Sequence, residues 1–196
     1  EAAQAYSVLA NRGIMVGSEV ISKEGTPHLA TVLHVDGVDQ RAVLDWSGLQ
    51  VKPVVSEQLA YLENNILSDE TARWSSLGHP NAYEVGRPAA VQSGQTSSGK
   101  DTWSIGYTPQ RLVAVWVGTE DTQAIPRLDY RPAAGIWHAL IQYVTRDLPA
   151  LNWDPPAGIS TVEVCDPSGL LPTTACPNLV NEVFLSGNEP TAADDL

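Results

Sequence analysis

The sequence predicts an α+β fold in which helices flank an antiparallel β-sheet. Three strand-like runs follow one another with only short polar turns between them, at residues 88–96, 101–107 and 112–118, and this spacing is typical of an antiparallel meander. One helical pattern precedes these runs and another follows them. The following helix is apolar on one side, so we expect it to pack across the sheet.

Residues 56–78 carry the clearest helical pattern. Ser56 stands where an N-cap is expected, because its hydroxyl oxygen can accept a hydrogen bond from a free backbone N–H group. The apolar face of this helix is predicted at Leu59, Leu62, Ile66 and Leu67. Residues 132–148 repeat the pattern, with Pro132 acceptable in the first turn. Their apolar face is predicted at Ala133, Trp137, Leu140, Ile141 and Val144.

Three smaller elements complete the predicted fold. Residues 2–12 have helical spacing and stop at Gly13, a residue type that commonly ends helices. Residues 30–46 alternate in polarity around a central Asp-Gly pair, which indicates a β-hairpin. Near the C-terminus, residues 160–165 (STVEVC) are one more strand candidate, and the rest of that part is expected to be irregular.

Length and composition limit the class of protein. The chain has 196 residues, of which 43% are hydrophobic, enough for one well-packed domain with an appendage. Its net charge of −12 argues against a nucleic-acid partner, which would need clustered Lys and Arg. No apolar run reaches the length of about 18 residues that a membrane span needs. We interpret the start, which is neither Met nor a targeting segment, as a position inside a longer protein.

A boundary is predicted near Leu148, which divides the chain into residues 1–148 and a C-terminal extension at 149–196. The extension holds seven of the fourteen prolines, seven acidic residues and no Lys or Arg. The acidic residues are Asp154, Glu163, Asp166, Glu182, Glu189, Asp194 and Asp195.

Both cysteines of the chain, Cys165 and Cys176, lie in this extension. Their closeness in a Pro-rich segment favours a disulfide formed outside the cytosol, and the alternative is a pair of unlinked buried thiols. A zinc site is disfavoured, because two ligands are too few and no His lies nearby in the sequence. We predict no metal and no cofactor.

Residues 86–121 resemble the closing part of the transpeptidase domain of class A penicillin-binding proteins, the bifunctional peptidoglycan synthases, here of the 1C-like type. That family has a strand ending in K-T-G-T-T, a strand of the type D-A-W-F-x-G-Y-T-P and a strand ending in W-V-G-x-D-D. The matching residues are Gly94, Thr96, Asp101, Trp103, Gly106, Tyr107, Thr108, Pro109, Trp116, Val117, Gly118 and Asp121. The helix AYSVLANRG and the cysteine-bracketed C-terminal segment also resemble family members.

The resemblance implies the C-terminal portion of a β-lactamase/transpeptidase-like fold. The complete protein would be a serine D,D-transpeptidase that cross-links peptidoglycan stem peptides in cell-wall synthesis and binds β-lactams. It would work on the outer side of a bacterial cytoplasmic membrane, anchored by an upstream segment. The nucleophilic serine would also lie upstream, so the fragment alone is expected to be inactive. The missing N-terminal part, in the same chain or as a separate one, would be its partner.

The stretch Ser97-Ser98-Gly99-Lys100 spells S-x-x-K, the pattern that pairs a nucleophilic serine with its lysine base in this family. The resemblance places it in the turn after the K-T-G strand, where a catalytic lysine would not be desolvated. We therefore read it as a hairpin turn.

The residues at the K-T-G-T-T positions are the candidate site for substrate and β-lactams. They are Gln92, Ser93, Gly94, Gln95 and Thr96. Gln92 removes the family's positive charge, a change worth about 1.5 to 3 kcal/mol at a carboxylate-binding position, or roughly 10- to 150-fold in rate. The alternative is a degenerate domain that binds peptidoglycan or partner proteins without chemistry.

Other conspicuous residues are expected to be structural. We expect Trp103 and Tyr107, on one face of a strand, to lie in the core, and Trp116 and Trp137 to pack helix against sheet. Local pairing is predicted for Glu120 and Asp121. The histidines are scattered and are assigned to surface or hairpin positions: His28, His34, His79 and His138.

Overall fold

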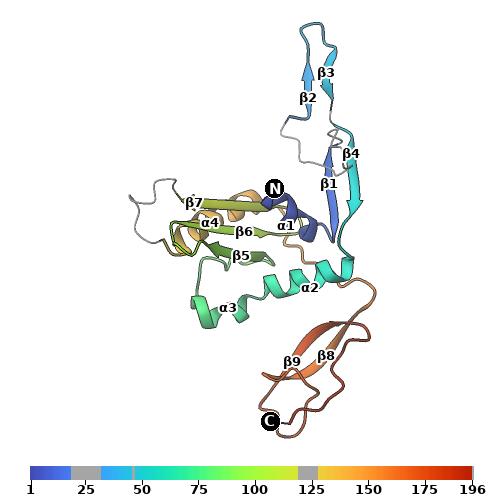
Figure 1. Cartoon of the computed structure of the whole chain (residues 1–196), viewed down its shortest axis with the longest axis vertical. Coiled ribbons are helices and arrows are strands. Elements are labelled where there is room, and N and C mark those ends of the chain that lie inside the picture. Colours follow the sequence, from blue (N-terminus) through green and yellow to red (C-terminus); the bar gives the residue numbers. More distant parts are fainter. Residues whose placement is uncertain (19–31, 46, 119–127, 196) are drawn as a thin grey trace.

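The computed structural model describes residues 1–18, 32–45, 47–118 and 128–195. A three-stranded sheet with helices on both sides forms the body (Figure 1). A two-part β-ribbon projects from one end of the body, and the C-terminal hairpin extends from the opposite end.

The central sheet contains β5 (Ala90–Gln95), β6 (Asp101–Tyr107) and β7 (Leu112–Gly118), paired in that order and antiparallel. The predicted meander is therefore confirmed. Register places Ser93 opposite Ser104 and Trp103 opposite Trp116, so each of these pairs lies on one face of the sheet.

Helix α4 (Arg131–Thr145) covers one face of this sheet, as the sequence predicts. Trp137 is fully buried there. A Cβ atom at Gly106 of β6 would lie 2.5 Å from the Trp137 ring, so the helix approaches the strand at a place where only glycine fits. Leu140, assigned to the apolar face, is instead 43% exposed.

Helices α1 (Ala2–Ala10) and α2 (Glu57–Ser68) pack against the opposite face. The Tyr107 hydroxyl donates a hydrogen bond of 2.8 Å to Asn64 Oδ1, and Asn64 Nδ2 donates one of 2.9 Å to the Leu9 carbonyl. Burial raises the pKa of Tyr107. One buried polar chain thus joins β6, α2 and α1.

The single helix predicted at residues 56–78 is wrong, because the chain breaks at Asp69 and begins α3 (Glu70–Leu77). Asp69 Oδ1 accepts hydrogen bonds from the amides of Thr71 and Ala72 at 2.9 and 3.1 Å. Burial opposes ionisation of this carboxyl, but these hydrogen bonds lower its pKa. The Ser56 cap is confirmed: its side chain accepts from the Leu59 amide.

The apolar face predicted for α2 is also partly wrong. Leu59 and Ile66 are exposed, whereas Ala60 and Asn64 are buried. A small residue and an amide face the sheet because α2 lies close to β5 and supplies the hydrogen-bond partner of Tyr107.

The projecting ribbon has two antiparallel pairs. β2 (His34–Asp36) pairs with β3 (Ala42–Asp45), which confirms the predicted hairpin over its described residues; positions 30, 31 and 46 lie outside them. β1 (Ile14–Ser18) pairs with β4 (Leu49–Pro53), and the sequence analysis predicts neither of these strands.

The C-terminal extension is more regular than expected. β8 (Ile159–Asp166) contains the predicted strand, but β9 (Asn178–Leu185) pairs with it antiparallel along its whole length. The disulfide between Cys165 and Cys176 is present, as predicted. The boundary near Leu148 stays a prediction. Within the described ranges, no helix combines the length and apolar character needed to cross a bilayer.

Candidate functional site

The five candidate site residues line one cavity of about 300 Å³, which lies against β5 and β6. β5 has β6 as its neighbour on one side only, so it is an edge strand of the described sheet. The lining comprises Tyr6, Gln92, Ser93, Gly94, Gln95, Thr96, Asp101, Trp103 and Ile105. The geometry brings the predicted residues together, while their role in binding stays a prediction.

Gly94 leaves the strand backbone open at this cavity. A Cβ atom built at Gly94 would meet only the Cβ of Trp103, at 3.9 Å. Internal packing therefore does not require glycine here, in contrast to Gly106, where a side chain would collide with Trp137. The absence of a side chain at Gly94 allows a ligand to approach the backbone closely.

A group of hydroxyls supports β5 from behind. Tyr83 is buried, and its OH shares a hydrogen bond of 2.8 Å with Ser104 Oγ. Burial raises the pKa of Tyr83, and hydrogen bonds with Ser104 and Ser93 oppose that rise. Ser93 is therefore tied to β6 and to the Tyr83 loop as well as lining the cavity.

None of the described residues that line the cavity carries a positive charge. Gln92 Nε2 donates a hydrogen bond of 3.0 Å to the carbonyl of Ser93, so the side-chain amide of Gln92 folds back onto its own strand. The one charged side chain in the lining is Asp101, and its Oδ1 is buried without a hydrogen-bond partner in the described structure. An anionic ligand would thus meet amides, hydroxyls and one carboxylate.

The predicted places of Trp103 in the core and of Trp116 between helix and sheet are both wrong. Trp103 is 38% exposed and lines the cavity, and Trp116 beside it is 47% exposed, so neither belongs to the core. Tyr107 and Trp137 are buried, as predicted. The reason is that α1 and α2 cover this face around Tyr107 and leave it open toward Trp103.

The S-x-x-K stretch forms the turn between β5 and β6, as predicted. Gly99 adopts a left-handed φ of 66°, and its amide donates a hydrogen bond of 2.8 Å to the Thr96 carbonyl. Ser97 and Ser98 are exposed at the tip. A serine needs a desolvated base beside it to act as a nucleophile, and an exposed turn does not supply that environment.

The histidines occupy separate places, as expected. His34 in the hairpin lies 2.8 Å from Asp36, whose hydrogen bond and charge raise its pKa. His79 lies 2.9 Å from Glu84, and His138 contacts the Ala82 carbonyl. His28 and the pair Glu120-Asp121 lie outside the described residues.

Residues 155–196 match a family described as penicillin-binding protein 1A, C-terminal domain. The chain is 26% identical to penicillin-binding protein 1A of Clostridium perfringens, an alignment that covers 96% of this chain and 22% of that relative. It is 25% identical to penicillin-binding protein 1A of Escherichia coli, over 96% of this chain and 24% of the relative. The chain is similar to the C-terminal region of penicillin-binding protein 1A.

The fold agrees with this similarity. A crystal structure of penicillin-binding protein 1A from Haemophilus influenzae superimposes with a TM-score of 0.68 at 20% identity, covering 97% of this chain and 32% of that one. The chain spans about a quarter of the length of the Clostridium perfringens and Escherichia coli relatives. The 1C-like type stays a prediction.

Several lining residues escaped the sequence analysis. Tyr6 reaches the cavity from α1, far away in sequence, and no local pattern identifies it. Asp101 and Ile105 could have been predicted from the alternation of side chains along β6, because odd-numbered residues of this strand lie on the same face as Trp103. That alternation is the signal that would have found them.

Proposed function

We propose that this chain is part of a penicillin-binding serine D,D-transpeptidase that cross-links peptidoglycan stem peptides. The observation that carries the proposal is the cavity along β5. Its lining gathers Gln92 to Thr96, at the K-T-G-T-T positions, in a chain similar to penicillin-binding protein 1A.

In this proposal a stem peptide lies extended along the edge of β5. Backbone groups of an edge strand can pair with a peptide as an added strand, and Gly94 permits close approach. Ser93 would contribute its backbone groups, because its side chain lies on the Ser104 face of the sheet. The half-exposed Trp103 would contact the apolar part of the ligand. A β-lactam would occupy the same place.

The chemistry would be acyl transfer. A serine supplied by sequence preceding this chain attacks the D-Ala-D-Ala carbonyl, a neighbouring base takes its proton, and D-Ala leaves. An amine of a second stem peptide then attacks the acyl-enzyme and forms the cross-link. The role of the β5 edge is to orient the substrate and to present backbone N–H groups to the developing oxyanion. This activity belongs outside the cytoplasm.

A second candidate is a non-catalytic domain that binds peptidoglycan or partner proteins. The specific observation in its favour is Gln92, whose amide hydrogen-bonds to its own strand and leaves the cavity lining without a described cation. Binding of a free carboxylate would then be weakened by about 1.5 to 3 kcal/mol relative to a lysine at this position.

Fluorescent penicillin applied to the full-length protein separates the two candidates. The transpeptidase predicts covalent labelling that peptide mapping assigns to one upstream serine, and faster labelling of Gln92→Lys by roughly 10- to 150-fold. Gln58→Lys on α2 is a matched control, because it adds the same charge away from the cavity. Absence of labelling in both wild type and Gln92→Lys would instead support the non-catalytic domain.

A further inference from the structure

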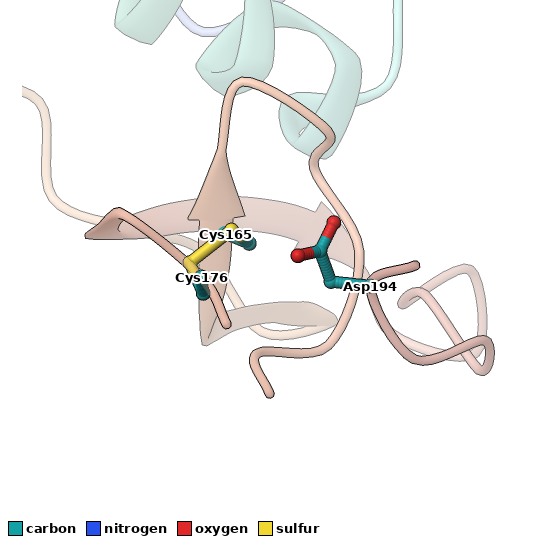
Figure 2. A group of neighbouring side chains, drawn as sticks. All are labelled: Cys165, Cys176 and Asp194. Carbon is teal, nitrogen blue, oxygen red and sulfur yellow. A yellow bond between two sulfur atoms is a disulfide. The ribbon is translucent and has the colours of Figure 1, made fainter. Parts of the chain in front are cut away.

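The C-terminal hairpin holds a buried carboxylate beside its disulfide. Asp194 is 6% exposed, and both of its carboxylate oxygens are buried without a hydrogen-bond partner among the described residues. One ligand atom from each of Asp194, Cys165 and Cys176 lies within 4.8 Å of the others. Figure 2 shows the carboxylate next to the two sulfur atoms.

Among the described residues, none offers this carboxylate a hydrogen bond or an ion pair while the disulfide is closed. Removing an ionised carboxylate from water without a partner is costly. Disulfide sulfurs carry no charge and donate no hydrogen bond, and residues 149–196 contain no Lys or Arg. The arrangement therefore favours a cation once the sulfurs become able to share in binding it.

We propose that reduction of this disulfide creates a Zn²⁺ site formed by the Cys165 and Cys176 thiolates and the Asp194 carboxylate. A dithiol breaks the S–S bond by exchange, gives its two protons to the cysteine sulfurs and leaves as a disulfide. A phosphine breaks the same bond and leaves as its oxide, with water supplying the oxygen and the two protons. Zn²⁺ then displaces those two protons, because thiolates are the metal ligands. The fourth tetrahedral position is open to water. This site is independent of the transpeptidase proposal.

The distances suit this coordination. Zn–S bonds of about 2.3 Å and Zn–O bonds of about 2.0 Å place tetrahedral sulfurs about 3.8 Å apart and a sulfur about 3.5 Å from the oxygen. The Cα atoms of the cysteines are 5.7 Å apart, so side-chain rotation can open the sulfur pair. The Asp194 oxygen needs to move little, since it already lies within 4.8 Å.

Backbone hydrogen bonds hold the ligands in place independently of the disulfide. The Asp194 amide donates a hydrogen bond of 2.8 Å to the Leu171 carbonyl, and the Leu171 amide donates one of 3.0 Å to the Ala192 carbonyl. Cys165 belongs to β8, and its amide donates 2.9 Å to the Leu170 carbonyl. The loop between the cysteines thus stays fastened to the segment that carries Asp194 after the S–S bond opens.

Ligand chemistry selects the metal. Two thiolates with one carboxylate suit zinc, whereas calcium and magnesium prefer sites made of oxygen ligands alone. The local sequence around Cys165 and Cys176 supplies only two zinc ligands. The third, Asp194, is distant in sequence from Cys165 and is brought to it by the fold.

The test measures Zn²⁺ retained by the whole chain after desalting, with and without prior reduction by a phosphine. Reduced wild type is expected to retain one Zn²⁺ per chain and oxidised protein none. Asp194→Asn is expected to weaken Zn²⁺ binding by at least about 10-fold, because even loss of a group that orients a ligand costs about 10- to 100-fold. Asp195→Asn, which changes the adjacent exposed acid, is the matched control and should bind like wild type.

Two outcomes overturn the proposal. One is equal Zn²⁺ retention by reduced and oxidised wild type, and the other is equal affinity of Asp194→Asn and Asp195→Asn. Co²⁺ added to reduced wild type gives a check that needs no variant. A tetrahedral ligand-field spectrum with a thiolate-to-Co²⁺ charge-transfer band supports the site, and an octahedral spectrum without that band contradicts it.

Discussion

The buried polar chain from Tyr107 through Asn64 to Leu9 gives a quantitative test of how the helices are fixed to the sheet. Replacing Asn64 by Leu keeps a similar volume but removes both hydrogen bonds of the amide. The Tyr107 hydroxyl then loses its partner, whereas the Leu9 carbonyl keeps a hydrogen bond of 3.2 Å from the Arg12 amide. One buried orphan costs about 1–3 kcal/mol. We therefore expect Asn64→Leu to lower the free energy of unfolding by about 1–3 kcal/mol.

Tyr107→Phe alone leaves one orphan, Asn64 Oδ1, and should cost about 1–3 kcal/mol. The double variant removes the Tyr107 hydroxyl together with its acceptor, and the Leu9 carbonyl keeps its hydrogen bond from the Arg12 amide. Adding Tyr107→Phe to Asn64→Leu should therefore restore about 1–3 kcal/mol. The assay is urea unfolding followed by tryptophan fluorescence, with all variants measured at one pH. Simple additivity of the two single effects would refute the hydrogen-bonded chain.

Three further predictions address other parts of the molecule. Gly106→Ala should lower the free energy of unfolding by about 1–3 kcal/mol, because its Cβ would overlap the Trp137 ring. Gly94→Ala should change the free energy of unfolding by less than about 1 kcal/mol. Denaturant unfolding in which Gly94→Ala loses as much stability as Gly106→Ala would contradict this packing. Asp36 raises the pKa of His34. The ion pair between His34 and Asp36 should therefore be fully present below the ordinary histidine pKa of about 6.5 and be lost as pH rises through the raised pKa. In an NMR titration Asp36→Asn should lower the pKa of His34, and an unchanged pKa would count against the contact. Thiol titration of unfolded, unreduced protein should detect no free thiol, and two would disprove the disulfide.

Local patterns were sufficient to predict the central sheet and its covering helix. β5, β6 and β7 follow one another with short turns, so pairing is decided by neighbours in sequence. The α4 periodicity likewise identifies Trp137 and Ile141 as buried. These elements need little information from distant segments.

Distant pairings were missed for the opposite reason. β1 finds its partner β4 only across the intervening hairpin, and β9 becomes regular because β8 is available to pair with it. The exposure of Trp103 has the same origin, because it depends on how far α1 and α2 extend over the sheet. Alternation along β6 identifies a face but not what covers it.

The candidate site was predictable in part. The positions Gln92 to Thr96 follow from one strand, so resemblance in a short segment was enough to select them. Tyr6 and Asp194 are placed by tertiary folding alone, and neither has a local pattern that marks it.

Gly94→Val tests whether the cavity along β5 receives the acylating ligand. The measurement is the labelling rate of the full-length protein by fluorescent penicillin, made in whichever background, wild type or Gln92→Lys, labels faster. A branched side chain at Gly94 would stand over the open backbone beside Trp103. We therefore expect the labelling rate to fall by at least about 10-fold, the equivalent of about 1.4 kcal/mol. Thr161→Val on the exposed side of β8 should label at the unchanged rate. If Gly94→Val is labelled as fast as its parent, the cavity along β5 is not where the acylating ligand binds.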